Sequence, residues 1–368
     1  MKKIFTLLTV FTLATSSTVT VISCAFTPEI QDNLLLIGKD IDKSKAIDDS
    51  ETNLQFTNYY ILGDSLSDSH GLEKLLKNDF DFEFKLGTDD KTNLEDYQYG
   101  SFSNGKTAAV LLNDKLGFKD IKPGVPDDKG EPKFGRNYAV GGATAADVVG
   151  IEGIVLNKVT LEKQARALVS QHKLRATDLV LIEIGGNDLL QLINEVDPQK
   201  ESTLMKQTVE RIQETLFTLL NNGIRKIVFS DAPDISLVPR YVNSDPNTKQ
   251  RATNLSTELH SRVKDMIKVV NCYYEHAVRE WGFYDNLPVL MEEFKAKHSG
   301  AELKVSFNIL DINFMNVMKT HAYHAERNPK IPTEANIKDY FFFDDIHPTR
   351  EVHQLAMEHY YKVLNGWV

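Results

Sequence analysis

Three apolar runs, each closed by glycine or a polar residue, most constrain what this chain can fold into. They are 59–63 (YYILG), 179–184 (LVLIEI) and 226–230 (KIVFS). Continuous apolar runs are typical of strands covered on both faces, as in parallel sheets. Amphipathic stretches with a period near 3.6, such as 161–173, lie between them. This alternation predicts an α/β fold with three layers, in which a central parallel sheet lies between two layers of helices.

The rest of the chain from residue 56 fits this scheme, with one exception. Helices are expected over 104–117, 203–223, most of 247–281, and 350–364, and short strands over 137–142 and 303–311. The exception is 79–100, which mixes acids and aromatics without either period. We interpret it as a loop near the mouth of a substrate site, and a solvated surface insertion is an equally good interpretation.

The first 55 residues have a different composition. Residues 1–23 combine two lysines, a short apolar core and a Ser/Thr-rich stretch, which is typical of a secretory signal peptide. The sequence VISC resembles a bacterial lipoprotein signal box, which predicts cleavage before Cys24 and a lipid anchor on its sulfur. The alternative is a plain secretion signal, with Cys24 free to pair with Cys272. Residues 24–55 are polar and acidic and predict a flexible tether, so the folded domain is expected over 56–368.

Bulk properties exclude several classes of function. The chain has 368 residues, of which 42% are hydrophobic, so it can bury a large core. Its net charge of -10 argues against a nucleic-acid partner, because phosphate binding needs clustered Lys and Arg. No phosphate-binding glycine loop is present, so no nucleotide cofactor is expected. The oligomeric state is left open.

Polar groups follow the ends of the expected strands. They are Gly63-Asp64-Ser65, Gly141-Gly142 and Gly185-Gly186-Asn187-Asp188, and Asp344 and His347 lie close together near the C-terminus. In doubly wound sheets, functional groups collect beyond the carboxyl ends of the strands. The chemistry that suits this set is nucleophilic catalysis. A serine needs a neighbouring base, the base needs a carboxylate to orient it, and the oxyanion needs preorganised N–H donors.

Each group also has a plainer interpretation. Ser65 can cap a following helix, Gly141-Gly142 can form a turn, and His347 can be a surface residue. Asp188 is expected to cap the helix that follows it, and Asp311 to be a structural cap. His321 and His324 have a spacing that could suit a metal, but no carboxylate or cysteine pattern supports them, so no metal is expected.

Taken in order, the four blocks resemble the GDSL, or SGNH, hydrolase family of lipases and esterases. The stretches SFSNGK, SDAPDISLVP and FFFDDIHPT add to the resemblance, which spans about 56–368 and points to the branch with phospholipases and haemolysins. The resemblance implies a three-layer, flavodoxin-like SGNH fold. It also implies a catalytic triad of Ser65, His347 and Asp344, since the spacing of Asp345 matches the family less well. The implied oxyanion hole is made by the Ser65 N–H, the Gly142 N–H and the Asn187 side chain.

The expected activity is hydrolysis of carboxylic esters through an acyl-serine intermediate. The resemblance and the expected anchor favour lipid esters, including phospholipid or lysophospholipid acyl esters, at a membrane surface. Three alternatives stay open: a carbohydrate O-deacetylase, an acyltransferase to an alcohol acceptor, and a non-catalytic surface-binding lipoprotein, since a fold does not fix a function. Export is expected in each case, with the protein either anchored at Cys24 or released.

Overall fold

The computed structural model describes residues 33–51, 54–88, 90–119, 121–124, 135–150, 152–298, 303, 305–310 and 322–367. The expected signal peptide, Cys24, Asp311 and His321 lie outside these ranges. Among the described residues, no helix combines the length and the apolar character that a membrane span requires.

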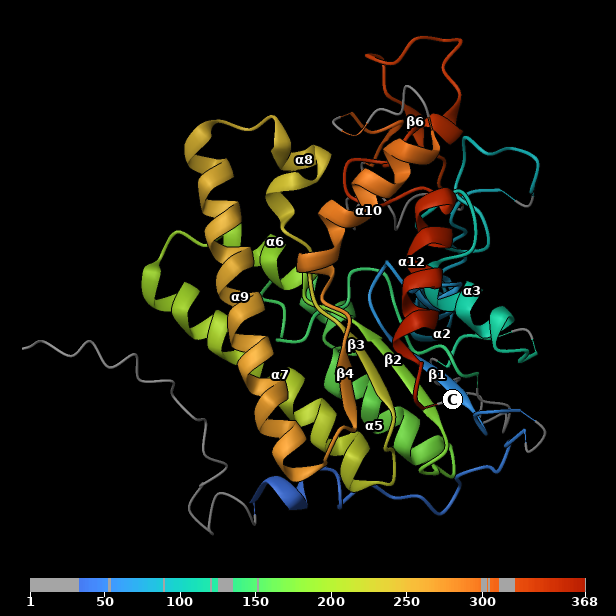
Figure 1. Cartoon of the computed structure of the whole chain (residues 1–368), viewed down its shortest axis with the longest axis vertical. Coiled ribbons are helices and arrows are strands. Elements are labelled where there is room, and N and C mark those ends of the chain that lie inside the picture. Colours follow the sequence, from blue (N-terminus) through green and yellow to red (C-terminus); the bar gives the residue numbers. More distant parts are fainter. Residues whose placement is uncertain are drawn as a thin grey trace, which may run out of the picture.

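The central sheet has four parallel strands that lie side by side in chain order (Figure 1). They are β1 (Tyr59–Gly63), β2 (Leu179–Glu183), β3 (Ile227–Ser230) and β4 (Val278–Glu280). The expected strand 137–142 runs parallel to β1 on its other side. It forms only an isolated bridge, in which the Tyr138 N–H donates to the Ile61 carbonyl at 2.7 Å. All carboxyl ends therefore face the same edge of the sheet, as a parallel arrangement requires.

One sequence expectation is confirmed and one needs correction here. The segment 247–281 is mostly helical, as expected, up to Tyr273, and residues 278–280 add β4 as the outer strand of the sheet. Its short sequence Val-Arg-Glu carries no apolar run, which is why the pattern did not reveal it. Among its described residues, the stretch 303–311 contributes β5 (Asn308–Ile309), which pairs antiparallel with β6 (Glu326–Arg327) in a separate two-stranded sheet.

Helices cover both faces of the sheet (Figure 1). One face packs against α5 (Leu161–Gln171), α7 (Pro198–Asn221) and α9 (Pro246–Tyr273). The other packs against α3 (Ala108–Lys115), α10 (Phe283–Lys297) and α12 (Arg350–Val363). The strands supply side chains to the two cores alternately, because successive residues of a strand point to opposite faces. Tyr60 and Leu62 enter the first core, and Tyr59 and Ile61 enter the second.

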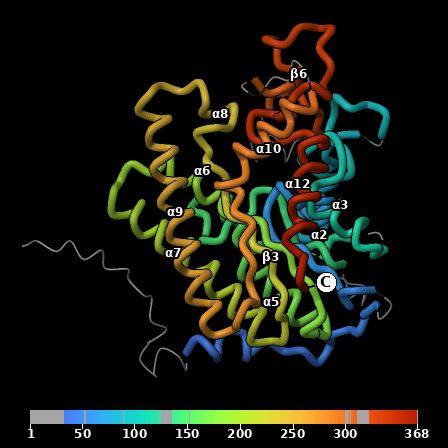
Figure 2. Tube along the Cα trace, viewed as in Figure 1, coloured from blue at the N-terminus to red at the C-terminus, as the bar shows by residue number. Residues whose placement is uncertain are grey.

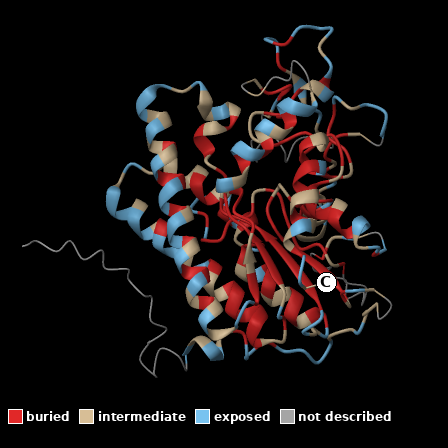
Figure 3. Cartoon of the chain, in the orientation of Figure 1, coloured by how far each residue is buried: buried red, intermediate tan, exposed pale blue. Residues whose placement is uncertain are grey.

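Strands β1, β2 and β3 are buried along their whole length, β4 is only partly buried, and exposed residues lie on the outer surfaces of the helices and in the loops (Figure 3). The three continuous apolar runs therefore form strands that are covered on both faces, as the sequence predicted. The remaining elements are α2 (Gly71–Phe80), α4 (Gly153–Leu156), α6 (Gly186–Asn194), η1 (Ile235–Leu237), α8 (Pro239–Val242) and η2 (Ile337–Asp339). In Figure 2, α6, α8 and α10 gather at the end of the sheet where the strands terminate.

Part of the segment expected as a tether contacts the domain. Ile41 is buried in the core shared with α5 and α7. The Ile47 N–H donates to the carbonyl of Gln171 at 2.9 Å, and Asp40 forms an ion pair with Arg166. In this structure, packing therefore extends N-terminal to residue 56.

Candidate active site

Ser65 stands in a tight turn directly after β1. The Asp64 N–H continues the sheet by donating to the Glu183 carbonyl at 3.2 Å, and an Asp64 carboxylate oxygen accepts from the Leu66 N–H at 3.0 Å. No helix begins here, since α2 starts at Gly71, so the N-cap interpretation of Ser65 is wrong. Burial raises the pKa of Asp64 to about 7. The turn holds Ser65 above the end of the sheet, with its side chain partly exposed.

His347 connects Ser65 to Asp344. The Nε2 atom of His347 lies 2.7 Å from the Ser65 hydroxyl oxygen. Its Nδ1 lies 2.9 Å and 3.1 Å from the two carboxylate oxygens of Asp344. The ring of Phe102 packs on the imidazole with 5.1 Å between centroids. A serine, an imidazole and a carboxylate in this order form a relay that can remove the proton of the serine hydroxyl.

Asp344 is fully buried, and its carboxylate has four hydrogen-bond donors around it. Besides the imidazole, it accepts from the His347 N–H at 2.7 Å, the Ile346 N–H at 2.9 Å and the Tyr97 hydroxyl at 2.9 Å. Burial by itself would raise its pKa, but His347 and these hydrogen bonds outweigh burial and lower the pKa of Asp344. The carboxyl is therefore held in its ionised form. Asp345 does not contact the imidazole and forms an ion pair with Arg240 instead.

Tyr97 is a site residue that the sequence did not reveal. It lies in the 79–100 segment, is buried, and packs its ring against Phe343 with 4.8 Å between centroids. This segment therefore contributes a direct contact to the relay, through the hydrogen bond of Tyr97 to Asp344. Tyr97 belongs to no motif, and the only available signal was the concentration of aromatics in a segment that matched no secondary structure.

Ser65, Gly142 and Asn187 line the same cavity. Among the described residues, neither the Ser65 N–H nor the Gly142 N–H has an acceptor. Gly142 has φ +85, a left-handed conformation that suits glycine. The Asn187 amide nitrogen donates to the Ala143 carbonyl at 2.9 Å, and its second hydrogen is available. Unpaired donors beside a nucleophile can stabilise a developing oxyanion.

Two buried carboxyls hold the glycine loop in place. Asp68 accepts from the Gly141 N–H at 2.7 Å. Asp188 accepts from the Ala145 and Ala146 N–H groups, each at 3.0 Å. The expectation that Asp188 caps its own helix is therefore wrong, because α6 has no side-chain cap and the carboxyl reaches across to the neighbouring loop. This fixes the loop from both ends and leaves the Gly142 N–H directed elsewhere.

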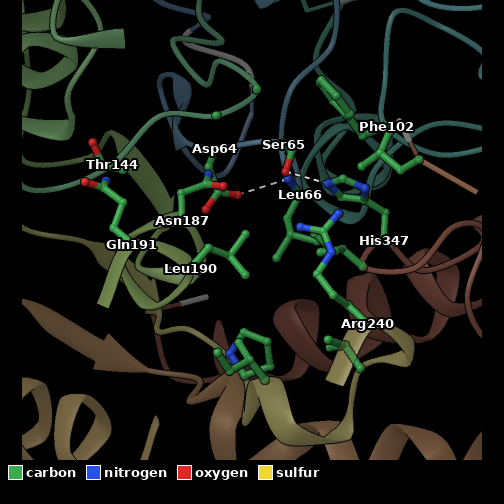
Figure 4. A pocket seen from close by; sticks show the side chains of 18 of the residues that line it. Asp64, Ser65, Leu66, Phe102, Thr144, Asn187, Leu190, Gln191, Arg240 and His347 are labelled. Carbon is green, nitrogen blue, oxygen red and sulfur yellow. Dashed lines mark hydrogen bonds between the residues drawn. The ribbon is translucent and has the colours of Figure 1, made fainter. Parts of the chain in front are cut away.

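A cavity of about 740 Å³ opens over this group and includes Ser65, Gly142, Asn187 and His347 in its wall. Figure 4 shows Ser65 facing His347 on one side, with Asn187 on the other. Most of the lining is apolar and includes Leu66, Leu190, Val238, Phe283, Leu287 and Phe342. The cavity can therefore take up an apolar chain next to the serine.

A separate cluster lies at the ends of β3 and β4. Asp231, His260 and Glu280 place their ligand-type atoms within 4.8 Å of one another. Asp231 and His260 already bond each other at 2.5 Å, and this bond raises the pKa of His260. Asp231 also accepts from the Tyr284 N–H at 3.1 Å. These bonds join Asp231 to His260 and to the first turn of α10, whereas the buried Oε1 of Glu280 has no hydrogen-bond partner within the described part of the chain. His324 bonds Asp96 at 2.8 Å.

A layered α/β fold with a Ser–His–Asp relay at the carboxyl ends of its strands is the architecture of a serine-dependent hydrolase. The chain belongs to the GDSL-like lipase/acylhydrolase family, which it matches over residues 59–360. Its fold is accordingly the three-layer SGNH fold, and its class of activity is hydrolysis of ester bonds.

The sequence identity of this chain to individual known proteins is low. The chain is 24% identical over 323 residues to the secreted effector protein SseJ of Salmonella typhimurium, covering 86% of this chain and 66% of that protein. It is 22% identical over 286 residues to the GDSL esterase/lipase At5g37690 of Arabidopsis thaliana, covering 72% and 78%. Among solved structures, the acetylxylan esterase Axe2 of Geobacillus stearothermophilus aligns with a TM-score of 0.39 and 9% identity, over 88% of this chain and 98% of that chain.

Proposed function

We propose that this protein cleaves carboxylic esters of lipids through an acyl-serine intermediate, with Ser65 as the nucleophile. The observation that carries the proposal is the 2.7 Å contact between the Ser65 hydroxyl and His347, whose other ring nitrogen bonds Asp344. His347 takes the Ser65 proton as the oxygen attacks the ester carbonyl. Asp344 holds the ring in the required tautomer and stabilises the imidazolium.

The negative charge that develops on the carbonyl oxygen is received by three donors: the Ser65 N–H, the Gly142 N–H and the Asn187 amide. His347 then returns the proton to the departing alcohol, and the acyl group stays on Ser65. A water molecule, deprotonated by the same imidazole, attacks the acyl carbon and releases the acid with Ser65 restored. Phe102 limits the motion of the imidazole between these two steps by packing on its ring.

The preference for lipid acyl groups rests on the cavity. Its predominantly apolar wall beside Ser65 favours an acyl chain over a small polar substituent. Phospholipid and lysophospholipid esters satisfy this requirement and carry a polar group near the ester bond.

Hydrolysis of p-nitrophenyl esters from C2 to C16 tests the proposal, with wild-type protein compared to Ser65→Ala. We expect activity that rises with chain length and is lost in Ser65→Ala. A sharp preference for C2 would instead favour a deacetylase. A folded wild type that cleaves none of these esters would contradict hydrolysis and turn attention to acyl transfer or binding. Ser170→Ala on α5 is a matched control for the loss of one hydroxyl.

We further propose that the protein is exported and acts at a membrane surface. The support is the signal-peptide composition of residues 1–23, and a relative from Salmonella typhimurium is named a secreted effector. Anchoring would use Cys24. The alternative is a disulfide between the two cysteines of the chain, Cys24 and Cys272. One sulfur cannot carry both a lipid and a disulfide, so the intact mass of the exported protein decides between them: lipidation adds the mass of acyl chains, and a disulfide removes two hydrogens.

A further inference from the structure

Arg240 is a cation in the wall of the cavity that holds Ser65. It belongs to the short helix α8, which follows η1 at the carboxyl end of β3. Of the described residues that line this cavity, it is the only lysine or arginine. In Figure 4 its guanidinium points from α8 toward His347 and Ser65. The position places a fixed positive charge beside the relay, although the proposed reaction has no step that requires one.

Asp345 holds this guanidinium in place. The Nε of Arg240 donates to the Asp345 carboxylate at 2.7 Å, and the Arg240 backbone N–H donates to the Asp345 carbonyl at 2.9 Å. Asp345 lies two residues before His347, so the guanidinium is attached to the loop that carries the relay. The pair therefore fixes the distance between the cation and the reacting centre better than a free surface arginine could.

The outer edge of the guanidinium is available to a ligand. Within the described part of the chain, neither Nη atom of Arg240 has a hydrogen-bond partner, and the side chain is 34% exposed. Two parallel N–H groups on a planar fork match two oxygens of a phosphate or carboxylate. The other charged wall residues include Glu152 and Glu195, which would repel an anion. Among the described wall residues, Arg240 is therefore the lysine or arginine at which an anionic group of the substrate would bind.

From this geometry we infer that Arg240 is a specificity-determining residue, which selects esters whose alcohol portion carries a phosphate. This deepens the proposed function and rests on it. The acyl chain lies along the apolar wall, the ester carbonyl lies at Ser65, and the phosphate contacts the two Nη groups of Arg240. The substrate class is then a glycerophospholipid or lysophospholipid, and a neutral glyceride is a poorer substrate.

The test compares two monomeric substrates with the same short acyl chain: 1-hexanoylglycerol and 1-hexanoylglycerol 3-phosphate. The quantity measured is the ratio of kcat/KM for the phosphate ester to kcat/KM for the neutral ester. A bidentate charge-assisted contact corresponds to a ratio about 10- to 100-fold higher in wild type than in Arg240→Gln. Arg240→Lys keeps the charge without the fork and should lie between them. 1-Hexanoylglycero-3-phosphocholine shows whether a phosphodiester serves as well as a monoester.

A surface pair on α9 supplies the control. Arg262 forms an exposed ion pair with Glu258, so Arg262→Gln removes the same charge far from the cavity and should leave the ratio unchanged. If Arg240→Gln lowers both kcat/KM values equally, Arg240 only supports the His347 loop and the inference is wrong. An unchanged ratio in Arg240→Gln would overturn it as well.

Binding separates this inference from the proposed reaction. Calorimetry with glycerol 3-phosphate and with 1-hexanoylglycerol 3-phosphate is carried out on Ser65→Ala and on Ser65→Ala/Arg240→Lys. Binding of the phosphate ester that weakens about 10-fold in the double variant supports Arg240 even if no ester is cleaved. Equal binding by both variants contradicts the inference, while ester hydrolysis that depends on Ser65 would leave the proposed function intact.

Discussion

Replacement of Tyr97 by Phe removes one donor from Asp344 and leaves the ring in place. The hydroxyl lies 2.9 Å from the carboxylate, which keeps its bonds to the His347 and Ile346 N–H groups and to the imidazole. The ring contacts with Phe102 and Phe343 do not involve the oxygen. The substitution therefore tests a single hydrogen bond to a buried charge, with almost no change in packing.

The size of the effect follows from these contacts. A hydrogen bond to a charged group contributes about 1.5–3 kcal/mol, so we expect the free energy of unfolding of Tyr97→Phe to fall by about 2 kcal/mol. Asp344 is ionised in both the ground state and the transition state, so the activation free energy changes less than the free energy of unfolding. We expect the activation free energy to rise by roughly 1 kcal/mol, which lowers kcat about 5-fold with KM unchanged. Replacing the carboxylate itself by an amide is expected to cost about 10⁴-fold.

A kinetic comparison distinguishes positioning from mere stabilisation. Without the Tyr97 hydroxyl, the Asp344 carboxylate has one bond fewer to fix its position, so it orients the His347 imidazole less well. The value of kcat should therefore fall in Tyr97→Phe while KM stays unchanged. Tyr99→Phe is the matched control, because Tyr99 lies in the same segment and its hydroxyl does not bond Asp344. If Tyr97→Phe keeps the wild-type kcat, the hydroxyl does not orient the relay and this reasoning is wrong.

Three further outcomes follow from the site. Asn187→Ala should lower kcat about 10²- to 10³-fold with little change in KM, and a rise in KM alone would rule out an oxyanion role. Gly142→Ala should destabilise the fold by about 1–2 kcal/mol in urea denaturation, because φ is +85 and the new Cβ would lie 3.1 Å from Leu156; equal stability would refute the strain argument. The native pKa of Asp64 is raised from 3.8 to about 7, so its protonated form favours the fold and its stabilising effect is lost as pH rises through 7. Wild type minus Asp64→Asn should thus lose about 1.4 kcal/mol of unfolding free energy per pH unit between pH 5 and 7, and a pH-independent difference would contradict this.

The sequence by itself determined where the central strands lie in the chain and which polar residues follow them. A strand that is covered on both faces must be apolar throughout, so β1, β2 and β3 are visible as runs, and the polar groups after them are visible as interruptions. Because parallel strands end at one edge, those interruptions had to meet. The sequence alone was therefore sufficient to predict one common site for Ser65, Gly142, Asn187 and His347. Asp344 could be preferred over Asp345 only through the family resemblance.

Only the tertiary structure shows the polar contacts between residues far apart in the sequence, because such contacts follow no periodic pattern. Tyr97 contacts Asp344 through one hydrogen bond and Arg240 contacts Asp345 through two, and such isolated polar contacts do not appear in hydrophobic periodicity. The same reason explains why Asp188 could not be distinguished from a helix cap, since a buried carboxyl bonds whichever N–H groups the fold brings to it. The pattern of apolar residues along the chain predicts which residues are buried. The hydrogen-bond partners of buried polar groups are determined only when the sheet and the helices pack together.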